Sequence, residues 1–177
     1  MACVFDANFL TLVLHPDADP PHDPSTQQPV TAAGQRLALL LDNLSKQNER
    51  IVIPTPALAE VLVLVGPSGP EYVRLLDRSA RFEIAPFDVR AAIENAQMLA
   101  DAIAGGNKRS GLEDAPWQKI KIDRQIVAIA RSRNIKTIYS TDRDIRKLAK
   151  DAGIEVRHLA DVDPPPDTMP LFSLADD

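Results

Sequence analysis

Short apolar runs and longer helical patterns alternate along the chain. Runs rich in β-branched or aromatic residues predict five buried strands, at residues 2–5, 51–53, 82–87, 136–140 and 154–159. Apolar side chains at helical spacing predict helices between them, at residues 34–48, 56–65, 71–80, 89–104, 121–134 and 144–153. This alternation predicts an α/β fold with three layers, in which a central, mainly parallel sheet of about five strands lies between two layers of helices.

Residues that favour helix ends support these boundaries. Thr55 is a candidate N-cap, and Pro56 fits the first helical position, where a missing N–H leaves no bond unmade. Gly153 follows its helical pattern as a candidate C-cap. Thr141 and Asp144 fit a capping box at the start of the same helix.

The 177 residues fit a single domain with one substantial core. The prolines cluster at residues 15–30 and 162–170, so we expect an exposed insertion at 15–30, a folded domain over 1–160 and an acidic tail over 161–177. The beginning, MACVFDANFL, has no basic leading region, and no apolar run is long enough to cross a bilayer. We therefore expect a cytoplasmic protein without a membrane partner.

The charge is distributed unevenly along the chain. The whole sequence has a formal net charge of −5, but residues 108–150 carry +7 and the remainder −12. The plain interpretation of such a run is a set of solvated helix faces. The alternative is a surface that attracts phosphates.

Four acids stand at positions that this architecture brings together. Asp6 ends the first strand and Asp142 follows the fourth; the carboxyl ends of parallel strands form the crevice where ligands bind. Glu60 and Asp123 each lie near the start of a helix, among apolar neighbours. An acid in apolar surroundings is costly to bury unless it is paired or bound to a cation.

Each acid also has a structural interpretation. Glu60 could face solvent, Asp123 could complement its helix dipole, and Asp142 could belong to a turn. Together, several carboxylates in one crevice repel one another unless cations neutralise them, and oxygen ligands suit Mg²⁺ or Mn²⁺. With the basic segment beside them, the acids predict metal-dependent hydrolysis of phosphodiesters.

Four blocks in this order carry a family resemblance: VFDANFL, VIPTPALAEVLV, KIDRQIVAIA, and YSTDRDI followed by KLAKDAGIEV. The chain resembles the PIN domain family, especially its VapC-type toxin ribonucleases. The resemblance implies a ribonuclease that depends on Mg²⁺ or Mn²⁺, with an antitoxin protein and a second copy of the chain as candidate partners. By position it assigns the catalytic and metal-binding acids to Asp6, Glu60, Asp123 and Asp142. Auxiliary roles fall to Asn8, Ser140 and Asp144.

Within the basic segment we assign RNA contacts to Lys119, Lys121, Arg124 and Arg143. The insertion at 15–30 and the 63 residues from Glu60 to Asp123 are long for a small toxin of this type. A non-catalytic RNA-binding or regulatory module of the same fold is the alternative, although such a module would not need all four acids. A phosphatase that begins with a similar strand needs a second Asp where this chain has Asn8.

Overall fold

The computed structural model describes residues 1–15 and 17–164. All five predicted strands form, and they pair in parallel in the order β3-β2-β1-β4-β5. In chain order they are β1 (Ala2–Phe5), β2 (Arg50–Pro54), β3 (Phe82–Ala85), β4 (Thr137–Tyr139) and β5 (Glu155–Arg157). The predicted fold class is therefore confirmed, and the sheet is wholly parallel.

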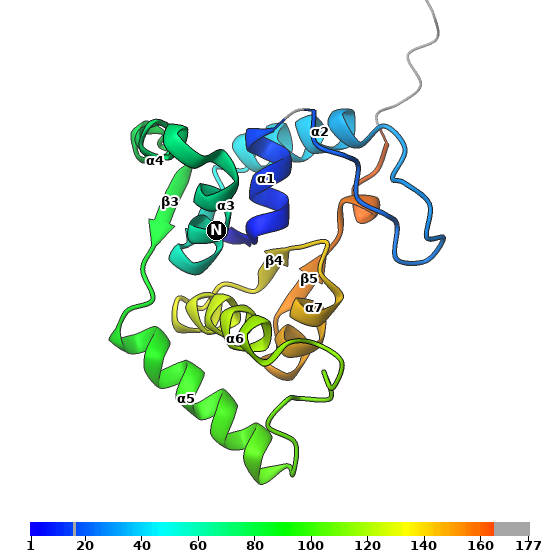
Figure 1. Ribbon diagram of the computed structural model, residues 1–177. Coiled ribbons are helices and arrows are strands. Elements are labelled where there is room, and N and C mark those ends of the chain that lie inside the picture. The colour runs from blue at the N-terminus through cyan, green and yellow to red at the C-terminus, as the bar shows by residue number, and fades with distance from the viewer. Residues whose placement is uncertain (16, 165–177) are drawn as a thin grey trace, which may run out of the picture.

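Helices connect the strands and cover the sheet (Figure 1). They are α1 (Ala7–Leu14), α2 (Ala33–Lys46), α3 (Thr55–Val65), α4 (Gly69–Arg78), α5 (Val89–Ala104), α6 (Trp117–Ser132) and α7 (Arg143–Asp151), with short 3-10 turns at Gly66–Ser68 and Leu159–Asp161. No helix in residues 1–15 and 17–164 combines the length and apolar character that a membrane crossing requires.

The alternation of side chains along β1 separates two cores. Val4 packs on one face in the larger cluster, to which α3, α6 and α7 contribute, whereas Cys3 and Phe5 pack on the other face with residues of α2. Figure 1 shows α6 and α7 in front of β4 and β5, with α2 apart from them beyond α1. Because both faces are covered, the central strands are apolar throughout, as the short continuous runs in the sequence predict.

The order in which successive strands are added to the sheet reverses between β1 and β4. From β1 it proceeds through β2 to β3 on one side, and β4 and β5 lie on the other side. Val4 is in register with Ile138, and Phe5 with Tyr139, so the two strands end side by side. The next residues are Asp6 and Ser140, and this switch point is where open parallel sheets bind ligands.

Two predicted caps are wrong. Pro54 is the N-cap of α3, and the Thr55 hydroxyl instead accepts a hydrogen bond from the Phe87 backbone N–H at 3.1 Å. Asp142, not Thr141, caps α7 and accepts from the backbone N–H of Asp144. At Thr55 a tertiary contact replaces the predicted cap, whereas at α7 another local residue takes the cap position.

Two further boundaries differ from the prediction. α6 begins at Trp117, four residues before the predicted start. Ala152 is the C-cap of α7; Gly153 follows it with a φ of +69°, a conformation that glycine adopts without strain. The early start of α6 matters most, because it places residue 119 on the same helix as Asp123.

In its described part, the segment 15–30 is a mostly exposed loop. An isolated antiparallel bridge joins His22 to Pro29, and the Asp23 carboxylate accepts from the Ser25 backbone N–H at 2.7 Å. Of the predicted tail, residues 165–177 lie outside the described residues. Asp161 belongs to a 3-10 turn and accepts from the His158 backbone N–H at 2.7 Å.

Candidate active site

Three carboxylates converge at the switch point of the sheet. Asp123 comes from α6, and Asp142 and Asp144 from the start of α7. One oxygen of each lies within 4.8 Å of the others. The Asp142 carboxylate accepts from the Asp144 backbone N–H at 2.7 Å, which fixes one acid relative to the next. This group is the structural centre of the predicted site.

The ammonium of Lys119 lies among these three acids. Its Nζ is 2.8 Å from Asp123, 2.7 Å from Asp142 and 2.9 Å from Asp144, in each case to Oδ2. Lys119 stands one helical turn before Asp123, the spacing at which a lysine and an acid meet on one helix face. A cation therefore already occupies the meeting point of the three carboxylates.

Asp6 and Ser140 link β1 to this group. The Asp6 carboxylate is fully buried, accepts from the Phe9 backbone N–H at 2.8 Å as the N-cap of α1, and accepts from the Ser140 hydroxyl. The Ser140 oxygen in turn accepts from the Asp142 backbone N–H at 2.9 Å. Ser140 thus fixes two of the predicted acids relative to each other.

Burial and mutual repulsion perturb the acids. Burial raises the pKa of Asp6 to about 7, Asp142 and Asp123 add to the rise, and the bonds from Ser140 and Phe9 oppose it. Burial likewise raises the pKa of Asp123 to about 6, against the attraction of Lys119. Burial lowers the pKa of Lys119, but its three carboxylates outweigh that effect and raise it overall. The site thus favours bound cations.

Glu60 and Asn8 lie on the exposed side of the site. Glu60, on α3, is exposed, yet partial burial of its carboxyl raises its pKa, Lys119 lowers it and Asp142 raises it. Glu60 therefore interacts electrostatically with Lys119 and Asp142, although it is not one of the three converging acids. Asn8 is exposed in the first turn of α1.

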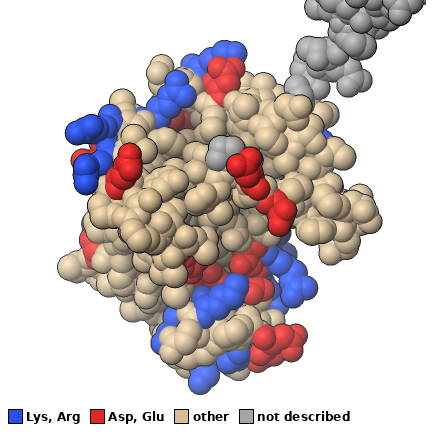
Figure 2. Space-filling view, turned by 45° about the horizontal axis from the view of Figure 1, so that its top comes forward, with Lys and Arg blue, Asp and Glu red and all other residues tan. Residues whose placement is uncertain are grey.

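Basic side chains border the acids. Arg143 lines two hollows that flank the start of α7. The smaller, of about 80 Å³, also contains Ser140, Asp142, Arg146 and His158 together with Pro24 of the insertion. The larger, of about 450 Å³, is lined by residues 111–115, Arg143, Asp144 and Lys147. Figure 2 shows basic and acidic side chains close together over the lower part of the face in view, without a separate basic patch.

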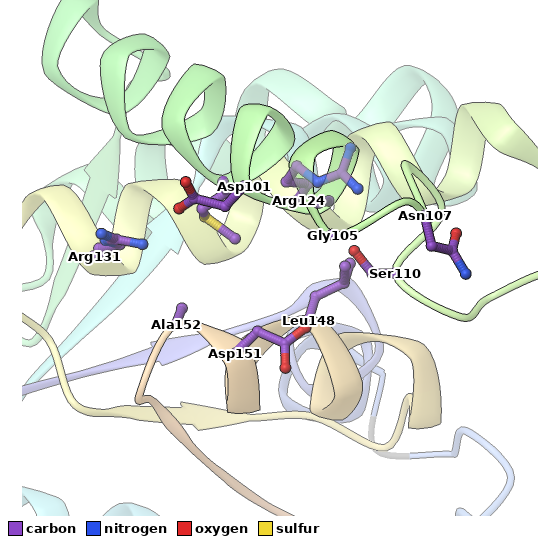
Figure 3. A pocket seen from close by; sticks show the side chains of 11 residues that line it. Asp101, Gly105, Asn107, Ser110, Arg124, Arg131, Leu148, Asp151 and Ala152 are labelled. Atoms are coloured by element: carbon purple, nitrogen blue, oxygen red, sulfur yellow. The ribbon is translucent and has the colours of Figure 1, made fainter.

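A different cavity lies between α5, α6 and α7 (Figure 3). It has a volume of about 350 Å³, and none of the predicted acids lines it. Arg124 lines it and is almost completely buried; its guanidinium donates to the Lys108 carbonyl at 2.9 Å and lies 5.8 Å from the centre of the Trp117 ring. Burial lowers the pKa of Arg124. Arg124 therefore holds the loop after α5 from inside.

The described residues thus divide the predicted site residues into groups. Asp123, Asp142 and Asp144 converge, and Asp6 joins them through Ser140. Of the residues predicted to contact RNA, Lys121 and Arg143 are exposed, Arg124 is buried, and the Lys119 ammonium lies among the acids. Sequence reasoning did not foresee Lys119 in that position; its spacing of four from Asp123 was the available signal.

Comparison with known families agrees with this geometry. The family model for the PIN domain matches residues 33–151, which is more than half of the chain. The chain belongs to the PIN domain family. No curated protein matches it.

Solved structures share the fold. VapBC2 from Rickettsia felis, bound to a DNA fragment from its promoter, has 16% identity and a TM-score of 0.58, and the match covers 89% of this chain and 98% of that chain. DNA-bound VapBC from Salmonella typhimurium has 15% identity, a TM-score of 0.55, and coverage of 90% and 98%. VapBC-1 from nontypeable Haemophilus influenzae has 12% identity, a TM-score of 0.57, and coverage of 90% and 98%. At these identities the likeness concerns the fold.

Proposed function

We propose that this protein is a metal-dependent ribonuclease that hydrolyses RNA phosphodiester bonds. The observation that carries the proposal is the convergence of Asp123, Asp142 and Asp144 at the switch point, with one oxygen of each within 4.8 Å of the others. Family membership supports it, because PIN domains are usually nucleases. We propose that Asp6 and Glu60 complete the acidic set and that Asn8 and Ser140 assist it.

The donor set fits Mg²⁺ or Mn²⁺. Both ions prefer oxygen ligands, and the three converging side chains offer only carboxylate oxygens. The Lys119 ammonium, within 2.9 Å of all three acids, supports the proposal, because it is a positive charge held by the same oxygens. When bound, the metal supplies a Lewis acid that activates water and neutralises charge on the phosphate.

The chain's own residues position the reactants. Asp6, buried and bonded to Ser140, holds the β1 end of the site fixed, because any movement would break its cap on α1. Arg143 lies between two hollows beside the acids, and Lys147 lines the larger one, so both can contact phosphates of a bound strand. Lys121 is exposed on α6, and we propose it as a further RNA contact from the sequence.

Cleavage of labelled structured RNAs tests the proposal. We expect cleavage with Mn²⁺, none after chelation, and a loss of at least about 100-fold in Asp142→Asn, because removal of an acid from a metal centre removes charge stabilisation in the transition state. Asp151→Asn, on the same helix but in the Arg124 cavity, is the matched control and should cleave normally. Equal activity of all three proteins with metal would contradict the proposal.

A non-catalytic RNA-binding module is the second candidate. The observation that favours it is the ammonium of Lys119, which already neutralises part of the acidic cluster. Such a module would bind RNA without cleaving it, with an affinity that falls as salt rises. RNA binding by the wild type without cleavage at millimolar Mn²⁺ would favour this candidate.

The similar structures also suggest partners. All three are VapBC structures, and two of them include DNA. We propose an antitoxin-type protein as a partner, with a homodimer as a second form of assembly. We also propose that residues 1–160 form one nuclease domain and that residues 161–177 form a tail. Copurification of a small protein encoded beside this one would support the first proposal.

A further inference from the structure

Lys119 makes more contacts than an ordinary helical ion pair. A lysine four residues before an acid needs only that acid as its partner. Here Asp142 and Asp144, from α7, accept from the same ammonium, so its three N–H donors each meet a carboxylate. The two successive helices α6 and α7, which β4 separates, are thus joined through one positive charge.

The ammonium occupies the place that a metal ion needs. Mg²⁺ binds carboxylate oxygens at about 2.0–2.1 Å, so an ion held by these three acids would be in contact with the atoms that Lys119 contacts. Two cations in contact with the same oxygens repel each other strongly where water is scarce. The carboxylates at which the two cations would meet are only 7% (Asp123), 19% (Asp142) and 15% (Asp144) exposed, so solvent screens the repulsion only in part, on the side of Lys119, which is 38% exposed. The two cations therefore exclude each other.

Lys119 can leave this place without unfolding the helix. Its side chain is 38% exposed, and its flexible stem of four carbons allows the ammonium to turn into solvent while the backbone of α6 stays in place. By contrast, Asp123 has a short side chain that is buried on α6, and the carboxylate of Asp142 is fixed as the N-cap of α7. The lysine is the mobile member of the group.

We propose that Lys119 is the resident counter-ion of the acidic cluster and that a divalent cation binds by displacing its ammonium. This inference rests on the proposed function, because it concerns the same acids. Lys119 keeps the carboxylates together while no metal is bound, and it raises the metal concentration that the site requires. It is a positioning residue that acts through the three acids.

Chemical labelling of lysines in the full-length protein tests the displacement. Acetylation by an N-hydroxysuccinimide ester, read by mass spectrometry, should be slow at Lys119 without metal, because its ammonium is held by three acids. Titration with Mn²⁺ should raise the rate at Lys119 at least about fivefold and leave that of Lys150, exposed on α7, unchanged. An unchanged rate at Lys119 while Mn²⁺ binds would overturn the inference.

Metal affinity gives an independent measurement. Lys119→Met removes the competing charge and keeps the length of the side chain, so calorimetry should show Mn²⁺ binding at least about 10-fold tighter than in the wild type. Lys150→Met should change the affinity less than about twofold, because that charge is exposed and screened. Lys119→Gln serves as a second variant if the methionine variant does not fold. Weaker binding in the folded variant would contradict the inference.

The two levels of the proposal fail in different ways. If neither the wild type nor the Lys119 variants bind Mn²⁺, the metal-dependent ribonuclease is wrong, and the inference with it. If both bind with equal affinity and labelling of Lys119 does not respond, only the inference is wrong.

Discussion

Asp123 and Arg124 are neighbours on α6, and both are buried, yet Asp123 lies among other charged groups and Arg124 contacts neutral groups. Asp123 faces Lys119 and two further acids at the sheet's switch point. Arg124 faces the cavity between α5, α6 and α7, where the Lys108 carbonyl and the Trp117 ring are its partners. No acid lies within ion-pair distance of Arg124 among residues 1–15 and 17–164.

The difference separates a charge held among like charges from a charge that fixes a loop. On the acidic side, three carboxylates share the single ammonium of Lys119, so negative charge remains in excess. On the other side, a carbonyl and an aromatic face satisfy the guanidinium without a counter-ion, and the result is a fixed loop. The acids of the first region are thus held beside like charges, whereas the contacts of the Arg124 guanidinium are with neutral groups.

The largest effect on stability is expected from Asp6→Asn. Because the pKa of Asp6 is raised to about 7, the folded protein binds a proton that the unfolded chain releases above pH 4, so stability falls as pH rises from about 4 to 7. The side-chain amide of Asn does not ionise, so it removes the free-energy cost of a buried charge. Its oxygen can still accept the hydrogen bond from the Phe9 backbone N–H. Without metal at pH 8 we expect a gain on the order of 3 kcal/mol, or roughly 6–12 °C in Tm, and none near pH 4.

Asp88→Asn is the matched control for this variant. Asp88 caps α5 through the Ala91 backbone N–H at 2.9 Å, as Asp6 caps α1, but Asp88 is exposed. Its substitution should leave the dependence of Tm on pH unchanged. Thermal unfolding of the wild type and both variants between pH 4 and 8 measures this dependence. A loss of stability in Asp6→Asn at pH 8 would show that the buried Asp6 charge does not destabilise the fold.

A smaller effect is expected from Lys119→Met without metal. Removing one partner of a buried charge group costs about 3–5 kcal/mol, but partial exposure of Lys119 screens the charges, so we expect a loss of about 1–2 kcal/mol at pH 8. Arg124→Met should change stability by less than about 1 kcal/mol, since the lost hydrogen bond is offset by relief of a buried charge. Urea unfolding measures both; equal losses would remove the distinction between the two regions.

The smallest effect is expected at Lys147, which holds the loop after α5 from the side of the acidic cluster. Its Nζ donates to the Gly111 carbonyl at 2.6 Å, whereas Arg124 holds the same loop at Lys108. Lys147→Met should change global stability by less than about 0.5 kcal/mol. Backbone amides of residues 107–115 should nevertheless exchange with deuterium faster, because local opening costs less. In Lys150→Met, the exchange of this loop should not change.

The sequence by itself determined the layers and the edge of the sheet at which the acids meet. Its alternating apolar runs predicted five strands and the helices between them, because strands buried on both faces must be apolar throughout. It also placed Asp6 and Asp142 together, since the carboxyl ends of adjacent parallel strands meet at one edge. Both conclusions follow from local pattern and from rules that hold for any sheet of this kind.

Only the tertiary structure decided which charges share the site. Asp142 caps α7 in place of Thr141, and Ser140 joins it to Asp6. The spacing of four put Lys119 and Asp123 on one face of α6. The pattern of residues 117–134 did not show what would lie opposite that face or opposite Arg124, because other segments of the chain decide this. α7 supplies two acids opposite Lys119, and the loop after α5 supplies a carbonyl opposite Arg124.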